Sequence, residues 1–180
     1  MNLIRRLIPL LLLSSLPCAA EGPDAPANPP DVLLKMIQAV ESSKTGGPTS
    51  RLGESGGTYH LRDAHFLGTV TRDGRTYTFG WLKFIRSRPA DRETPPARGH
   101  DFIVVLDPEF KLVSHGEAGM GPYRIEGDRL IGDGVDVDLQ SKDPLIRRNG
   151  FLIGGQFLEY PFPDRITDEE WESGKFKRSN

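Results

Sequence analysis

The sequence predicts an α+β protein in which a curved, mostly antiparallel β-sheet, open or partly closed into a barrel, packs against an N-terminal amphipathic helix. A short second helix is expected near the C-terminus. From residue 58 onward, short runs rich in β-branched and aromatic residues alternate with Gly, Asp-Gly and Asn-Gly turn signals. Before them, residues 32–42 place apolar side chains at helical spacing. The turn spacing predicts about seven to nine strands, and sheets of that size tend to curl.

The strongest strand signal is residues 66–84, a hairpin predicted to close at Asp73-Gly74, because these residues tolerate the positive φ of a two-residue turn. The long strands are expected at 58–71 and 75–87. Two cross-strand pairs then follow: Val70 with Tyr77, and Phe66 with Trp81. Side chains alternate along a strand, which assigns one face to Tyr77, Phe79 and Trp81 and the other to Leu67, Leu82 and Phe84.

The N-terminal helix is predicted over 32 to about 42, with Asp31 as its N-cap. Its apolar face is made of Val32, Leu33, Met36, Ile37 and Val40. We expect this face to cover one side of the sheet. At the other end of the chain, Thr167 and Glu170 have the spacing of a capping box and predict the short second helix.

The remaining strands are placed by their turns. Residues 101–106 are continuously apolar after Asp101 and predict a strand covered on both faces. Asp107-Pro108 predicts a type I turn, and Gly127-Asp128 predicts a hairpin that sets Glu126 opposite Arg129. The segment 135–139 alternates apolar and acidic residues. Two further expectations concern the last strands: a hairpin at Asn149-Gly150 joining 145–148 to 151–153, and a bulge or bend at Gly154-Gly155.

Residues 1–20 predict a cleaved secretory signal peptide. Arg5 and Arg6 precede an apolar run at 7–16 that is too short to span a bilayer, and Ala20 ends a run of small residues suited to cleavage. The expected location is therefore periplasmic or secreted, by a Sec-type route. A lipoprotein with lipid on Cys18 is the less favoured alternative, because Pro17 precedes the cysteine.

The mature chain is expected to be a single β-rich domain over 31–180. A Pro-rich leader at 21–30 and a Gly-rich segment at 44–57 are expected to be disordered or flexible. Cleavage removes the single cysteine and changes the net charge from −2 to −4. These properties exclude thiol chemistry and give no sign of nucleic-acid binding, and no integral membrane span is expected after cleavage. The sequence leaves the oligomeric state open.

No cofactor or metal is expected. The acidic residues from Asp133 to Asp143 lack the spacing of a calcium-binding loop. On a strand, Asp63 and His65 would share a face, and His100 or His115 could approach them from neighbouring strands. This arrangement is the basis of one alternative function, a hydrolase of the cell envelope. A second alternative is a carrier of an apolar ligand or lipid held in the curved sheet.

The leading functional hypothesis is a small exported, non-enzymatic binding or inhibitor module of the cell envelope. It rests on arginines expected at hairpin tips and in the long loop 87–100, which contains three prolines. The candidate contact residues are Arg72, Arg75, Arg86, Arg88, Arg92 and Arg98. Their partner would be an envelope protein or a polyanionic surface, because arginine pairs well with carboxylate and phosphate groups.

Overall fold

The computed structural model describes residues 28–43, 58–87, 99–119, 121–132, 134–153 and 155–176. It is mostly antiparallel β-sheet with a few short helices, as the sequence predicts. The helices are α1 (Pro30–Ser42), α3 (Pro144–Asn149) and α4 (Asp168–Glu172). The strands are β1 (Thr58–Arg72), β2 (Arg75–Ser87), β3 (Gly99–Leu106), β4 (Leu112–Ala118), β5 (Arg124–Glu126), β6 (Arg129–Gly132), β7 (Val135–Asp138), β8 (Phe151–Ile153) and β9 (Gln156–Leu158).

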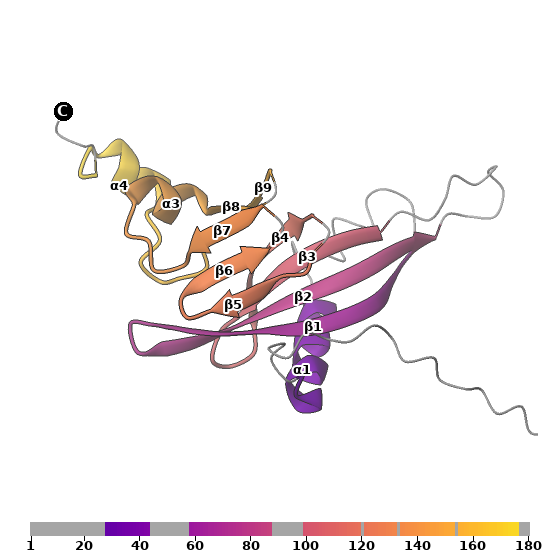
Figure 1. Ribbon diagram of the computed structural model, residues 1–180. Helices are drawn as coiled ribbons and strands as arrows, with labels where there is room; N and C mark the ends of the chain where they lie inside the picture. Colours follow the sequence, from indigo (N-terminus) through magenta and orange to yellow (C-terminus); the bar gives the residue numbers. More distant parts are fainter. Residues whose placement is uncertain are drawn as a thin grey trace, which may run out of the picture.

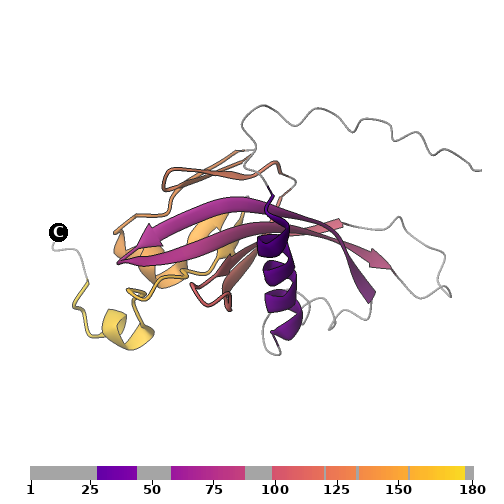
Figure 2. The ribbon, with the colours of Figure 1, turned by 90° about the horizontal axis from the view of Figure 1, so that it is seen from below.

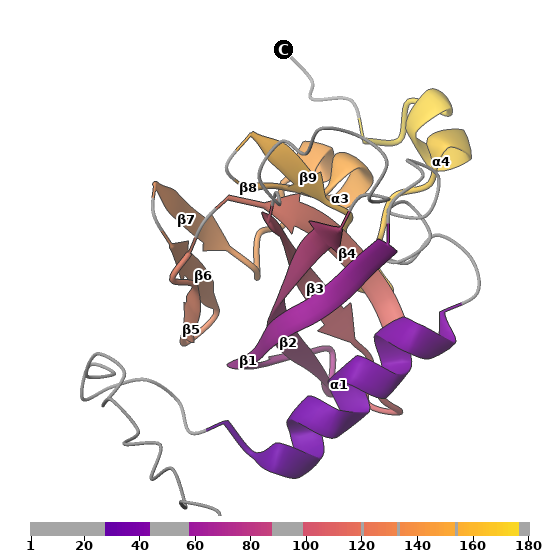
Figure 3. The ribbon, with the colours of Figure 1, turned by 90° about the vertical axis from the view of Figure 1, so that its right-hand side faces the viewer.

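The described strands form three open sheets with the orders β1-β2-β3-β4, β5-β6-β7 and β8-β9, so the barrel alternative is not formed in this part of the chain. Figure 1 shows the long β1–β2 hairpin running across the molecule, with β5–β9 and α3 on one side. Helix α1 crosses the strands of the four-stranded sheet (Figure 2) and lies away from β5–β9 (Figure 3). None of the described helices is long and apolar enough to cross a membrane.

The four-stranded sheet separates two apolar cores. On the β5–β9 side, Tyr77, Phe79 and Trp81 pack with residues from the two smaller sheets. On the other side, Met36 and Val40 of α1 are almost fully buried against the sheet. The predicted faces of β2 and of the helix are therefore confirmed. The helix begins two residues earlier than predicted, because Pro29 is the N-cap and Pro30 supplies a helical φ at the first position. Asp31 is therefore not the N-cap and lies in the first turn.

The turn at Asp73-Gly74 is confirmed: Arg72 pairs with Arg75, and the two turn residues have φ of 50° and 74°. The predicted pair of Phe66 with Trp81 is wrong. A bulge around Leu67 sets Phe66 opposite Gly80 and His65 opposite Trp81.

The bulge also moves the Leu67 side chain into the core on the β5–β9 side, opposite to its predicted face. It depends on Gly68, which has φ 140°. A Cβ atom at this glycine would lie 2.9 Å from the Cβ of Ile125 on β5, so only glycine allows β5 to approach β1 this closely.

Of the other predicted turns and caps, some are confirmed and others differ from the prediction. The turn after Asp107 is confirmed by a 2.9 Å hydrogen bond from the Phe110 amide to the Asp107 carbonyl, and Glu126 faces Arg129 as predicted. The capping box of α4 is also confirmed. Where a bulge or bend was expected before Gln156, the chain turns between two paired strands, since Ile153 pairs with Gln156; Gly154 itself lies outside the described residues.

The hairpin predicted at Asn149-Gly150 is wrong, because residues 144–149 form helix α3. Asp143 caps this helix by accepting a hydrogen bond from the Leu145 amide, and Pro144 starts it. Gly150, with φ 105°, then ends the helix and leads into β8. The Asn-Gly pair is thus a helix C-terminus rather than a hairpin turn.

Candidate functional site

The six candidate arginines do not gather on one surface. Arg75 is exposed at the tip of the β1–β2 hairpin, whereas Arg86 lies on β2 eleven residues further along. That separation corresponds to roughly 36 Å of strand, and Figure 1 shows the two ends of β2 on opposite sides of the molecule. Arg88, Arg92 and Arg98 lie outside the described residues. The hairpin tip and the end of β2 that carries Arg86 are therefore two separate candidate surfaces.

Arg72 is a buried structural residue, only 5% exposed, and so is not part of an open binding surface. Its guanidinium donates to the Leu139 carbonyl at 3.0 Å and to the Asp164 carboxylate at 2.7 Å. It also lies over the rings of Tyr160 and Phe162, at 5.3 and 4.9 Å from their centroids. The position of Arg72 beside a hairpin tip predicts an exposed side chain. No signal in the sequence indicates that its partner is Asp164, 92 residues away.

Asp164 is the centre of this network. It accepts the Tyr160 hydroxyl at 3.0 Å, and its carboxylate lies 3.2 Å from Arg147 as well as beside Arg72. Burial opposes ionisation of Asp164, but the hydrogen bonds from Arg72 and Tyr160 and the charges of Arg72 and Arg147 outweigh it and hold its pKa below the ordinary value. Burial, followed by the hydrogen bond to Asp164, raises the pKa of Tyr160. The network is a structural clamp.

Asp63 and His65 meet as predicted, with 2.9 Å between the Asp63 Oδ2 and His65 Nε2 atoms. A carboxylate in this position can orient an imidazole for proton transfer. The third group predicted for this site, His100 or His115, does not lie on the same face of the sheet as Asp63 and His65. His100 pairs with Phe84 on the α1 side of the sheet and bonds Glu117 at 3.0 Å, whereas His65 stacks on Trp81 on the other side.

His115 also lies away from that pair. It faces Val104, a residue of the core on the α1 side, and its ring packs against Phe102 with 6.4 Å between centroids. His65, His100 and His115 therefore do not build the catalytic constellation considered from the sequence. Among the described residues, no three His, Cys, Asp or Glu side chains are grouped to hold a metal ion.

Lys83 and Asp101, which sequence reasoning missed, complete the polar cluster around Trp81. The indole nitrogen donates to Asp101 at 3.1 Å, and the Lys83 ammonium lies 4.0 Å from the indole centroid. Burial raises the pKa of Asp101, against the opposing Trp81 hydrogen bond and Lys83 charge. Trp81 itself is only 6% exposed. The cluster encloses an indole and presents no open face on which a substrate could stack.

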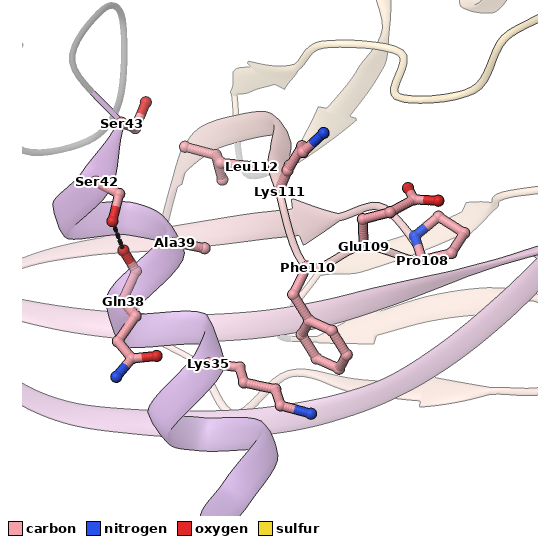
Figure 4. Close-up of a pocket in the computed structure, with 10 residues that line it drawn as sticks. All are labelled: Lys35, Gln38, Ala39, Ser42, Ser43, Pro108, Glu109, Phe110, Lys111 and Leu112. Atoms are coloured by element: carbon pink, nitrogen blue, oxygen red, sulfur yellow. Dashed lines mark hydrogen bonds between the residues drawn. The ribbon is translucent and has the colours of Figure 1, made fainter.

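A groove of about 770 Å³ lies between α1 and the β3–β4 turn. Figure 4 shows Lys35 extending from α1 toward the ring of Phe110, and the ammonium lies 4.6 Å from the ring centroid. Lys111 and Glu109 add one charge of each sign to the rim. The groove thus has mixed polarity and gives no clear preference for a ligand.

An apolar groove of about 400 Å³ lies between α3 and the β8–β9 hairpin. Leu145 on α3, Leu152 on β8 and Phe157 on β9 line it, with exposed fractions of 54, 58 and 57%. Leu152 and Phe157 are directly opposed across the hairpin. The groove follows from the α3 cap and the Gly150 turn, which place Leu145 beside two outward-facing hairpin residues.

A polar hollow of about 510 Å³ adjoins this groove. Asn149 and Phe157 line both, so the two hollows meet at these residues. The polar side contains Arg148 and Arg165, and His115 also lines it. Arg148 precedes the predicted Asn149-Gly150 turn and belongs to the arginines expected at hairpin tips, whereas Arg165 was not a sequence candidate for binding.

Comparison of the chain with protein-family models, with curated proteins and with solved structures found no match. The class of the protein is therefore defined by its own topology, an open antiparallel α+β fold with a four-stranded sheet at its centre.

Proposed function

We propose that this chain is a small exported, non-enzymatic module that binds another protein of the cell envelope. The observation that carries the proposal is the convergence of Leu145, Leu152 and Phe157, each more than half exposed, on a single groove. Large apolar side chains gathered at one exposed site are characteristic of a protein-binding surface. A site of this kind supports the binding function better than the polar clusters do.

The two alternative functions have weaker support. The Asp63–His65 pair is compatible with a proton-transfer role, but His100 and His115 pair with residues of the opposite face. A lipid carrier would need apolar space within the curved sheet. The face turned toward β5–β9 is instead filled by large side chains such as Tyr77, Phe79 and Phe151.

Arg86, at the end of β2 opposite the hairpin tip, remains part of the proposal as a second contact, together with Arg88, Arg92 and Arg98, which lie outside the described residues. With Arg75 it would serve a partner carrying carboxylates or a polyanionic sugar. Arg72 is not included, because its guanidinium is already held by Asp164 and the Leu139 carbonyl.

The first test is capture from an envelope extract, with cross-linking in place, followed by direct binding of the identified and purified partner. The bait is residues 21–180. Replacing Leu152 and Phe157 by Ser removes two apolar side chains worth about 2 kcal/mol each when buried, so we expect partner affinity to fall by more than about 100-fold. Leu34→Ser is the matched control, since Leu34 is 55% exposed on α1, away from the groove.

A bait with Arg88, Arg92 and Arg98 changed to Ser tests the second contact. Weaker partner binding by this variant, with the Leu34→Ser control unchanged, is the result we expect. Equal binding by the groove variant and by wild type would remove the groove from the proposal. A partner bound equally well by all of these variants would contradict both surfaces.

Export is tested separately. We expect the protein recovered from the periplasm of a bacterial host to begin at Glu21, because Ala20 ends the small-residue run that signal peptidases cut after. Intact-mass spectrometry measures this start directly. A chain that retains Met1, or one with a lipid on Cys18, would contradict cleavage at this site.

A further inference from the structure

The apolar groove and the polar hollow form one continuous surface. Asn149, the last residue of α3, and Phe157, on β9, line both of them. Leu152 lies on the apolar side of the Phe157 ring, and Arg148 and Arg165 lie on the polar side. A ligand that crosses Phe157 therefore passes from an apolar environment to one in which two arginines are paired with the carboxylates of Asp168 and Glu159.

Both arginines have only weak carboxylate partners. Arg148 lies 5.0 Å over the Trp171 ring, and its nearest carboxylate, Asp168 at 3.1 Å, is 82% exposed. Arg165 is 3.5 Å from Glu159, and both side chains are about half exposed. Exposed ion pairs of this kind contribute little, so a carboxylate brought in by a ligand can replace Asp168 or Glu159 at low cost.

We propose that this surface binds a short extended segment of a partner protein that carries an apolar side chain and, within about four residues of it, an aspartate or glutamate. The apolar side chain enters the groove beside Leu152, and the carboxylate is bound by Arg148 and Arg165. This inference rests on the proposed function and specifies its partner.

The size of the surface favours a segment over a second copy of this chain. The groove has about 400 Å³, at the lower end of the range for pockets that accept small ligands. A stable dimer buries about 800 Å² on each partner, which a site of this size does not provide alone. Charge selects the composition of the segment, because the arginines favour carboxylates beside the apolar side chain.

The test is selection of phage-displayed random peptides on immobilised mature chain. Peptides of about nine residues are long enough in extended form to cross both hollows. Selected sequences are then synthesised with a fluorescent label, and their affinities are measured by anisotropy. We expect selected peptides to combine apolar and acidic residues, and we expect Asp→Asn or Glu→Gln changes in the peptide to weaken binding roughly tenfold.

Protein variants locate the site. The double change Arg148→Gln and Arg165→Gln should weaken the acidic peptide by roughly tenfold or more, and Phe157→Ser should do the same for every selected peptide. The control is Arg124→Gln with Arg129→Gln, because these arginines are also about half exposed and paired with carboxylates. Circular dichroism checks that each variant is folded, and the peptide-side changes test the charge requirement without altering the protein.

Several results would overturn the proposal. These are selection of no peptide, selected peptides without acidic residues, or acidic peptides that bind the Arg148/Arg165 variant as tightly as wild type. Self-association that is lost with Phe157→Ser would assign the surface to a second copy of this chain instead. Binding of laurate that is lost with the same change would assign it to an amphiphile. If the capture experiment still yields a partner lost with the groove variant, the binding module stands and only this segment is rejected.

Discussion

Replacing Asp164 by Asn is expected to lower the free energy of unfolding by about 3 kcal/mol. Arg72 is 5% exposed and donates to this carboxylate, and the cost of breaking a buried ion pair on one side is about 3–5 kcal/mol. We take the lower end because Asp164 itself is 29% exposed. Urea denaturation of the wild-type and variant mature chains measures the difference.

Asp136→Asn is the matched control, because Asp136 pairs with Arg129 at an exposed site; we expect a change of at most about 1 kcal/mol. The effect of Asp164 also depends on pH. Its pKa is lowered in the folded protein, so its stabilising effect is complete above the ordinary value of 3.8 and is lost as the pH falls through the lowered pKa. A stability difference that stays constant into strong acid would show that the charge of Asp164 does not cause the effect. A difference that matches the control at neutral pH would show that the clamp is unimportant.

Gly150→Ala is expected to cost about 3 kcal/mol or more of folding stability. Two effects add at this position. Its φ of 105° is unfavourable for a residue with a side chain, and a Cβ atom would lie 2.2 Å from the Leu158 carbonyl oxygen and 2.9 Å from the Glu159 Cα. Both neighbouring atoms belong to the backbone, so relief requires β9 to move.

Gly155→Ala separates these two effects. Gly155 has a similar φ of 87°, but no atom lies within 4 Å of the position of its Cβ, so we expect a cost of only about 1 kcal/mol. Thermal or urea unfolding of both variants gives the comparison. Equal losses of folding stability at the two glycines would mean that β9 is not packed closely against Gly150. The position of the β8–β9 hairpin beside α3, which forms the apolar groove, would then need another explanation.

Local signals predicted much of this fold. Asp73-Gly74 forms the hairpin turn because both residues accept positive φ, and Thr167 with Glu170 caps α4 because their side chains reach each other's backbone. Asn149-Gly150 carries an equally strong turn signal. There the Asp143-Pro144 helix start takes precedence, and the glycine ends a helix instead. An Asn-Gly dipeptide favours positive φ. Whether that φ belongs to a hairpin turn or to the end of a helix depends on the residues several positions before it, here Asp143 and Pro144.

Long-range packing explains what the sequence could not predict. Leu67 changes face because Ile125 must approach Gly68, a contact between strands far apart in the chain. Arg72 was expected to be exposed, and its burial depends on Asp164. The Asp63–His65 contact was predictable because it needs only the alternation of one strand. The apolar groove was not, because Leu145 and Phe157 come together only after α3 and the β8–β9 hairpin have formed.

The Arg72–Asp164 contact also constrains the order of folding. If the chain emerges from the export channel N-terminus first, the tip of its longest hairpin can form locally, but the Arg72 guanidinium lacks this partner until residue 164 has emerged. Contacts between residues so distant in sequence slow folding, because a large loop must close before they contribute. The β1–β2 hairpin is therefore expected to form early and its Arg72–Asp164 contact to form late. Formation of this contact requires that the C-terminal part of the chain has packed against the hairpin tip.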